Sequence, residues 1–121
     1  MPKTLLIVED EELVRSMLRD KFEQSGYAVL EAEDGREGQN LLEDQTVDLV
    51  ISDLIMPRQD GLELLMAMRA EWPDVPLIAI TAPSNQLYLE VAGRLGAART
   101  FEKPLDLKKL EDAVIDLLRM E

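Results

Sequence analysis

The sequence of 121 residues contains no histidine and no cysteine. Without histidine, the chain cannot carry out serine–histidine catalysis, build a histidine–zinc site or form its own phosphohistidine. Without cysteine there are no disulfides, thiol nucleophiles or thiolate metal sites, which fits a cytoplasmic location. Carboxylates, hydroxyls and amines are therefore left to carry any chemistry.

Long apolar stretches are also absent. No run approaches the roughly 18 residues that suggest a membrane span. The N-terminus leads into only four apolar residues before Glu9, which is unlike a signal peptide. We therefore expect a cytoplasmic protein with no membrane association.

Basic residues are scarce: 13 Lys and Arg stand against 25 Asp and Glu, giving a net charge of -12. Such an acidic surface repels nucleic acid, so we expect no direct nucleic-acid partner. Hydrophobic residues make up 46% and charged residues 31%, as in ordinary globular proteins. The length predicts a single domain over residues 1–121.

Short apolar runs alternate with segments of helical periodicity. The runs have the length of buried strands and are bounded by Gly, Pro or Asp. They cover residues 5–8, 27–30, 47–51, 75–80 and, more weakly, 100–101. This alternation predicts an α/β fold with a parallel sheet and helices on both faces.

The intervening segments carry apolar stripes at helical spacing. Gly26 is expected to cap the first helix at its C-terminal end, and Asp106 the last at its N-terminal end. Segment 35–44 is the weakest prediction, with only Leu41 and Leu42 as anchors. The other stripes are Leu13, Val14, Met17, Leu18 and Phe22; Leu62, Leu65, Met66 and Trp72; Leu87, Val91, Ala92 and Leu95; and Leu107, Leu110, Val114, Leu117 and Leu118.

Polar residues follow four of the predicted strands. Glu9 and Asp10 follow the first strand, Asp53 the third, Thr81 the fourth and Lys103 the fifth. Functional residues of an open parallel sheet collect beyond the carboxyl ends of its strands. If the second strand lies at an edge, the other four strand ends converge on one pocket.

Such a pocket would have a defined chemistry. Crowded carboxylates repel one another, so at least one should have a raised pKa, and Mg²⁺ would relieve the repulsion. A carboxylate can attack phosphorus to form an aspartyl phosphate. A lysine ammonium, a hydroxyl and the metal would stabilise the transferring group. Asp10, Asp53, Thr81 and Lys103 supply these parts.

Four motifs in this order resemble the receiver domain of bacterial two-component response regulators, including the stand-alone receivers of chemotaxis. They are LLIVEDE at 5–11, DLIMPRQDG at 53–61, TA at 81–82 and KP at 103–104, and the likeness covers nearly the whole chain. The resemblance implies a flavodoxin-like (βα)5 fold whose five-stranded parallel sheet has the order 2-1-3-4-5.

The resemblance also implies a role for each metal-site residue. Asp53 would be the phospho-acceptor and, with Asp10, a direct Mg²⁺ ligand. The main-chain carbonyl of Ile55 would be a further ligand, and Glu9 would act through water.

The other motif residues would shape or read the phosphoryl site. Thr81 would bind the phosphoryl group, and Lys103 would pair with it. The small Ala82 would allow access, while Pro57 and Gly61 would shape the loop after the acceptor.

A histidine kinase or histidine phosphotransfer protein would donate the phosphoryl group in a Mg²⁺-dependent reaction. The modified switch would then change its affinity for a downstream target protein. We expect the chain to catalyse only its own phosphorylation and dephosphorylation. No DNA-binding effector domain is expected, and the chain is either a stand-alone receiver or part of a larger protein.

The partner surface is expected on the fourth helix, fifth strand and fifth helix. Tyr88, Leu89 and Ile115 are its candidate residues, because they widen the apolar faces of their helices. Many receivers carry Tyr or Phe three residues before the lysine, but this chain has Thr100. Phe101 follows, and strand alternation should point it to the opposite face.

Three alternatives remain open. A haloacid-dehalogenase-type phosphatase would need a second aspartate where Ile55 stands. A flavodoxin relative would need a phosphate-cradling loop where residues 9–12 are all acidic. A receiver fold used only for protein interaction would have lost the chemistry, although its residue set is complete here.

Overall fold

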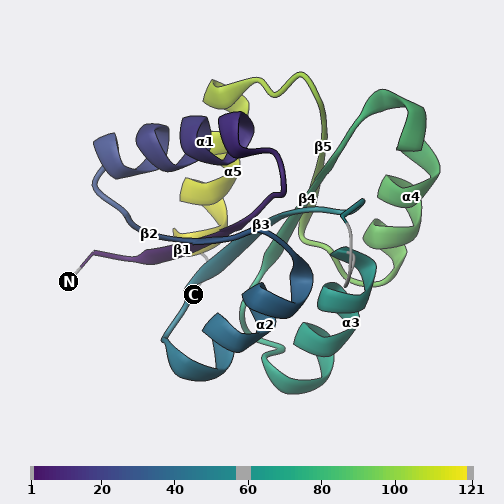
Figure 1. Ribbon diagram of the computed structural model, residues 1–121, viewed down its shortest axis with the longest axis horizontal. Helices are drawn as coiled ribbons and strands as arrows, with labels where there is room; N and C mark the ends of the chain where they lie inside the picture. The colour runs from purple at the N-terminus through teal and green to yellow at the C-terminus, as the bar shows by residue number, and fades with distance from the viewer. Residues whose placement is uncertain (1, 57–60, 120–121) are drawn as a thin grey trace.

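The computed structural model describes residues 2–56 and 61–119, which form a parallel sheet between two layers of helices (Figure 1). The strands are β1 (Thr4–Val8), β2 (Ala28–Ala32), β3 (Leu49–Asp53), β4 (Leu77–Thr81) and β5 (Arg99–Glu102). Their order is β2-β1-β3-β4-β5, and every neighbouring pair is parallel. The flavodoxin-like fold and its strand order are therefore confirmed.

Helices connect the strands in the predicted alternation. They are α1 (Glu12–Gln24), α2 (Gly35–Asp44), α3 (Gly61–Glu71), the 3-10 turn η1 (Pro83–Asn85), α4 (Gln86–Arg94) and α5 (Leu107–Arg119). Asp106 accepts a hydrogen bond from the Lys109 N–H (3.1 Å), as expected of a helix cap. Gly26 follows α1 with a φ of 96°, a left-handed conformation that suits glycine at a helix end.

Strands β3 and β4 extend further toward their polar ends than their apolar runs predicted. Asp53 pairs with Ile80, and Thr81 with Glu102, so these polar residues still belong to the parallel ladder. Val47 and Val75 instead precede their strands. The ladder thus places the chemically active side chains on the rigid ends of strands rather than on loops.

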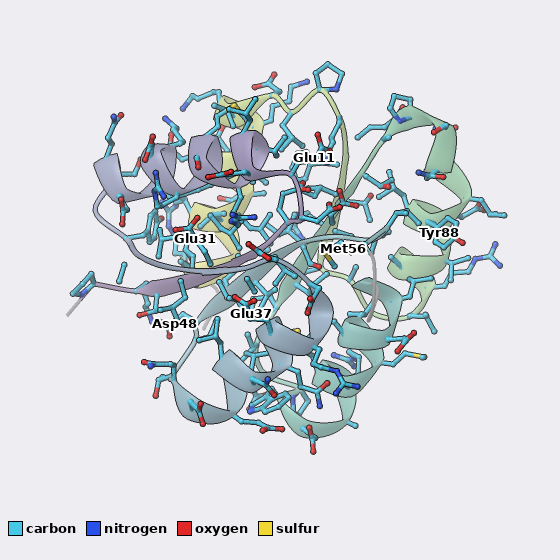
Figure 2. The ribbon with its side chains drawn as sticks, viewed as in Figure 1. Glu11, Glu31, Glu37, Asp48, Met56 and Tyr88 are labelled. Carbon is cyan, nitrogen blue, oxygen red and sulfur yellow. The ribbon has the colours of Figure 1, made fainter. Side chains whose placement is uncertain are left out.

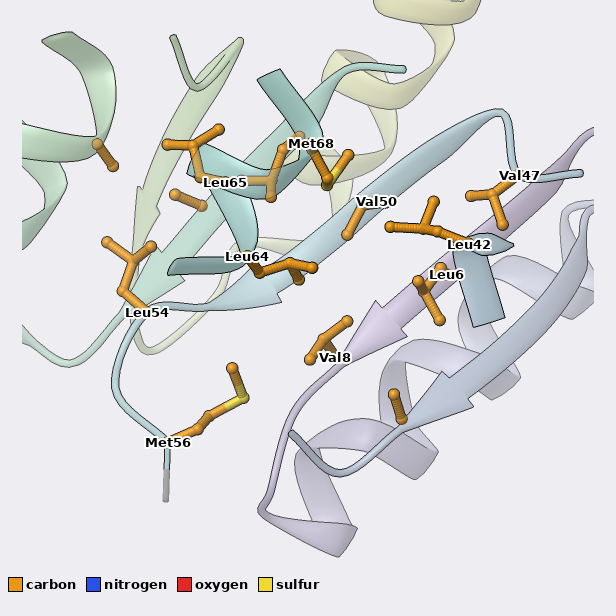
Figure 3. Packing of buried hydrophobic residues seen from close by; sticks show 14 residues of the cluster. Leu6, Val8, Leu42, Val47, Val50, Leu54, Met56, Leu64, Leu65 and Met68 are labelled. Atoms are coloured by element: carbon orange, nitrogen blue, oxygen red, sulfur yellow. The ribbon is translucent and has the colours of Figure 1, made fainter. Parts of the chain in front are cut away.

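Alternate residues of each buried strand point into two separate cores. Leu6 and Val8 of β1 face α2, α3 and α4, whereas Leu5 and Ile7 face α1 and α5. Figure 3 shows the first core, where Val8 lies near Leu64. Its buried members are Leu6, Val8, Ala32, Leu42, Val47, Val50, Leu54, Met56, Leu64, Leu65, Met68, Leu77, Ala79 and Ala92.

The predicted stripe of α1 was wrong at two positions. Leu13 is 87% exposed and Met17 is 42% exposed, whereas Leu18 and Phe22 are fully buried. Val14 packs against the same core as Leu18 and Phe22. Residues 14, 18 and 22 follow one line along the helix, and positions 13 and 17 are rotated away from it by about 100°.

Helix α4 leaves a broad apolar face in solvent, and its predicted stripe was wrong at three positions, because only Ala92 of that stripe is buried. Leu87, Tyr88, Val91 and Leu95 are between 36% and 70% exposed. Leu89 instead packs partly against the first core. Among the described residues, no helix is both long and apolar enough to cross a membrane.

Candidate functional site

Four strand ends meet at one small cavity, as the strand order requires. Helices α1 and α2 cover opposite faces of the sheet. From β1 the chain first adds β2 on one side and then returns to add β3 on the other, so the direction of strand addition switches between β1 and β3. Such a switch point opens a crevice at the carboxyl ends of the strands. The cavity has a volume of about 200 Å³ and is lined by Asp10, Glu11, Asp53, Ile55, Thr81, Ala82, Asn85 and Lys103.

Lys103 is the central cation of this cavity. Its Nζ lies 2.8 Å from Asp53 Oδ2, 2.9 Å from Glu9 Oε1 and 3.1 Å from Glu11 Oε1. The sequence predicted that Lys103 and Asp53 share one pocket, but it predicted neither their direct ion pair nor the contact of Lys103 with Glu11. Glu11 directly follows Glu9 and Asp10 in an acidic run, and that run was the only sequence signal for its position.

Asp53 is held from two sides. Its Oδ1 accepts a hydrogen bond from the Ile55 N–H (2.9 Å), and its Oδ2 accepts one from Lys103 (2.8 Å). The residue is only 5% exposed. The carboxylate is thus fixed in orientation where the cavity reaches the end of β3.

Glu9 is the carboxylate of this cluster whose pKa is raised. Burial raises the pKa of Glu9 to about 7, although Lys103 and the Glu11 N–H lower it, and the Asp53 charge raises it further. Burial alone would lower the pKa of Lys103, but Asp53 and Glu9 outweigh burial and raise it. The prediction of at least one raised carboxyl pKa is therefore confirmed at Glu9.

Two buried polar atoms lack a hydrogen-bond partner among the described residues. They are Glu9 Oε1 and the Thr81 hydroxyl. Glu9 Oε1 does form the 2.9 Å ion pair with Lys103, without the geometry of a hydrogen bond. Thr81 is fully buried, and its hydroxyl remains available to an oxygen entering the cavity.

The donor set fits a hard divalent cation. Carboxylate oxygens of Glu9, Asp10 and Asp53 lie within 4.8 Å of one another. Oxygen ligands from one or two carboxylates suit Mg²⁺, which keeps several waters. The Ile55 carbonyl stays a predicted ligand, since only its N–H contact is defined. Pro57 lies outside the described residues.

The metal-free protein should lose stability as pH rises through neutrality. The pKa of Glu9 rises from 4.5 to about 7 on folding. The free energy of unfolding is highest below pH 4.5, where both the folded and the unfolded chain hold the Glu9 proton. It falls as pH rises from 4.5 through about 7, because in this range only the folded chain holds the proton. In denaturation with EDTA, wild type should lose roughly 3 kcal/mol over this range relative to Glu9→Gln. If the unfolding free energies of wild type and Glu9→Gln change with pH in the same way, the pH dependence does not come from Glu9.

Strand β5 confirms the expected alternation around Thr100. Phe101 packs against the core beneath α1 and α5, whereas Thr100 is exposed on the opposite side, toward α4. There it lines an open groove of about 550 Å³ with Gln86, Leu87, Leu89, Glu90 and Glu102. A large aromatic side chain at position 100 would occupy part of this groove.

A parallel sheet of this order, with an acidic cavity around a buried aspartate and lysine, defines the class of receiver-type signalling domains. The chain belongs to the family of response regulator receiver domains, whose family model matches residues 5–115. It is thus a component of phosphorelay signalling. Domains of this family generally bind Mg²⁺ at an acidic pocket, and they interact with histidine kinases and downstream targets.

Curated relatives include response regulators of several bacteria. Response regulator MprA of Mycolicibacterium vanbaalenii is 38% identical over 120 residues, which cover 98% of this chain and 52% of the relative. Regulator of RpoS of Escherichia coli is 38% identical over 117 residues, covering 96% of this chain and 35% of the relative. The chain therefore spans about a third to a half of these relatives.

Solved receiver domains share the fold. The receiver domain of the TMAO respiratory system response regulator TorR is 34% identical, with a TM-score of 0.90 and coverage of 98% of both chains. The receiver domain of NtrX from Brucella abortus is 26% identical, with a TM-score of 0.92 and coverage of 97% of this chain and 99% of that one.

Proposed function

We propose that the chain is a phosphorylation switch in which Asp53 accepts a phosphoryl group. One observation carries the proposal: the buried Asp53 carboxylate lies between the Ile55 N–H and the Lys103 ammonium. The same cavity contains the unpartnered Thr81 hydroxyl. A nucleophile, a cation and a hydrogen-bond donor are thus present together.

In the proposed reaction, an Asp53 oxygen attacks the phosphorus of a phosphohistidine on the donor protein. A P–O bond to Asp53 forms as the P–N bond breaks, and the imidazole leaves with its electron pair. Lys103 and Thr81 bind phosphoryl oxygens and stabilise their negative charge while the phosphoryl group is transferred to Asp53. Asp10, Asp53 and the Ile55 carbonyl would hold Mg²⁺ directly and Glu9 through water, and the ion would neutralise charge on the transferring group.

The proposed donor is a histidine kinase or histidine phosphotransfer protein, and the proposed receiver of the signal is a downstream target protein. The chain acts in the cytoplasm and catalyses only its own phosphorylation and dephosphorylation.

Tyr88, Leu89 and Ile115 form the proposed partner surface. Tyr88 is 39% exposed and lies on α4 (Figure 2), while Leu89 and Ile115 are half-buried. Charged substitutions there that leave target binding intact would exclude this surface.

Acetyl phosphate tests the acceptor directly, because it needs no partner protein. Incubation with Mg²⁺ should add one phosphoryl group to the wild-type mass, and Asp53→Asn should remove the adduct, since an amide is a poor nucleophile. Asp44→Asn is the matched control, because Asp44 is exposed at the end of α2. An equal adduct on Asp53→Asn would assign the acceptor elsewhere. No adduct on wild type would refute self-catalysed transfer from small donors.

A further inference from the structure

A largely buried arginine lies next to the acidic loop, which consists of residues 9–11 between β1 and α1. The Arg15 side chain on α1 is only 12% exposed, and its Nη1 donates to the main-chain carbonyl of Glu9 at 2.8 Å. Its Nε donates to Glu31 Oε1 at 3.3 Å. Its Nη2 lies 3.9 Å from Glu33 Oε1. Glu31 belongs to β2 and lies beside α1 in Figure 2.

Arg15 bonds to the chain on both sides of Asp10. Its guanidinium holds the Glu9 carbonyl, and its main-chain N–H donates to the Glu11 carbonyl at 2.9 Å. The Glu9 N–H is also tied, to the Ala32 carbonyl of β2 at 3.0 Å. The Glu11 N–H in turn donates to Glu9 Oε2 at 3.1 Å. Among these bonds, the one to the Glu9 carbonyl is the contribution of the guanidinium, so the Arg15 side chain supplies one of the anchors of the acidic loop.

We propose that Arg15 is a positioning residue for the cation site. It does not line the cavity. It fixes the peptide between Glu9 and Asp10, so that both carboxylates face the same point. A planar guanidinium suits this task because it can bond a carbonyl and a carboxylate at once, whereas an ammonium is a point charge. The inference rests on the proposed function, since it assumes that the acidic site binds Mg²⁺.

The charge of Arg15 and its bond to the Glu9 carbonyl should have opposite effects on Mg²⁺ affinity. A positive group near a cation site repels Mg²⁺, so removing only the charge should tighten binding. Loss of the clamp should loosen binding, because groups that orient metal ligands commonly contribute about 10- to 100-fold in metal affinity. The sign of the change therefore separates positioning from simple electrostatics.

Arg19 offers a matched control on the same helix. Its Nη1 pairs with the same Glu31 carboxylate at 3.3 Å, and its Nε and Nη2 both donate to Asp20 at 3.1 Å. None of the contacts defined for Arg19 reaches the acidic loop. Arg15→Met and Arg19→Met remove the same charge from the same ion-pair network, but only Arg15→Met removes the bond to Glu9.

The test measures Mg²⁺ affinity by calorimetry and, without metal, the hydrogen exchange of the Glu11 amide. Arg15→Met should weaken Mg²⁺ binding by about tenfold. Arg19→Met should leave the affinity unchanged or slightly tighter, and Arg15→Lys should fall between wild type and Arg15→Met. The Glu11 amide should exchange faster in Arg15→Met alone. Thermal unfolding of both methionine variants separates these changes from a general loss of stability.

Equal Mg²⁺ affinities and unchanged Glu11 exchange in the two methionine variants would overturn the positioning role. If Arg15→Met does not fold, Arg15→Lys against Arg19→Lys decides by the same two measurements. Failure of the proposed phosphorylation function would give a different result from failure of the positioning role. Wild type would then neither bind Mg²⁺ nor gain the phosphoryl adduct, whatever occupies position 15.

Discussion

Lys103→Met should destabilise the metal-free protein by about 3 kcal/mol at neutral pH, because removing one partner of a buried ion pair leaves the other charges uncompensated. Asp53 and Glu9 carry this cost, since their side chains are 7% and 0% exposed. Glu11 contributes little, because it is 63% exposed to solvent. Urea denaturation in EDTA measures the change.

The loss of stability in Lys103→Met should be smaller at acidic pH and after addition of Mg²⁺. Near about pH 5, Glu9 holds a proton in the folded chain, so one of the repelling charges is absent. Mg²⁺ should restore more stability to Lys103→Met than to wild type, because the competing ammonium has gone. Lys108→Met is the control, since Lys108 is 78% exposed and pairs only with Asp112 among its defined contacts. A variant as stable as wild type at every pH would contradict this view.

Gly61→Ala should be comparably damaging, at about 3 kcal/mol, because an added methyl group would meet backbone that cannot move aside. A Cβ at Gly61 would clash with the Asp53 carbonyl oxygen and would lie 2.7 Å from the Leu54 Cα. The Gly61 N–H also donates to the Leu54 carbonyl at 3.0 Å. The start of α3 is thereby pressed against the strand that ends in the acceptor.

The same substitution at Gly93 is the matched control. A Cβ there would meet nothing within 4 Å, and the residue lies within α4. Gly93→Ala should therefore stabilise the protein by about 0.5–1 kcal/mol, because alanine loses less entropy than glycine in a helix. Both variants are compared by chemical denaturation, and by acetyl phosphate labelling, which Gly61→Ala should reduce. Equal stability of the two variants would show that the acceptor strand yields to the methyl group.

The sheet and the core of the site could be predicted because their signals are local and redundant. Strands buried on both faces have continuous apolar runs, as in β1, β3 and β4. Four of the five predicted strands precede a polar site residue. Strand order then brings Asp10, Asp53, Thr81 and Lys103 to one cavity. The second helix was the weakest prediction because Leu41 and Leu42 are its only strong apolar anchors. Its start is fixed instead by Asp34, whose side chain accepts a hydrogen bond from the Glu37 N–H at 2.9 Å.

The parts that sequence could not predict depend on side-chain direction. Arg15 has the pattern of an ordinary charge on an amphipathic helix, and only the folded chain shows it turned back toward the Glu9 carbonyl. The contact of Glu11 with Lys103 joins residues 92 positions apart. Leu13 was assigned to the core because hydrophobicity alone does not give the helix rotation. These errors concern the orientation of side chains, and those of β3 and β4 concern strand bounds; no predicted element is missing.

The outermost strands bear on how the protein behaves when concentrated. A strand at the border of a sheet offers unpaired N–H and C=O groups to other chains, and charged side chains discourage such pairing. Strand β5 is four residues long and presents Arg99 and Glu102 to solvent. On the opposite border, β2 carries Glu31 within the network of Arg15 and Arg19. Both borders therefore oppose strand addition between copies, which protects against aggregation through the sheet.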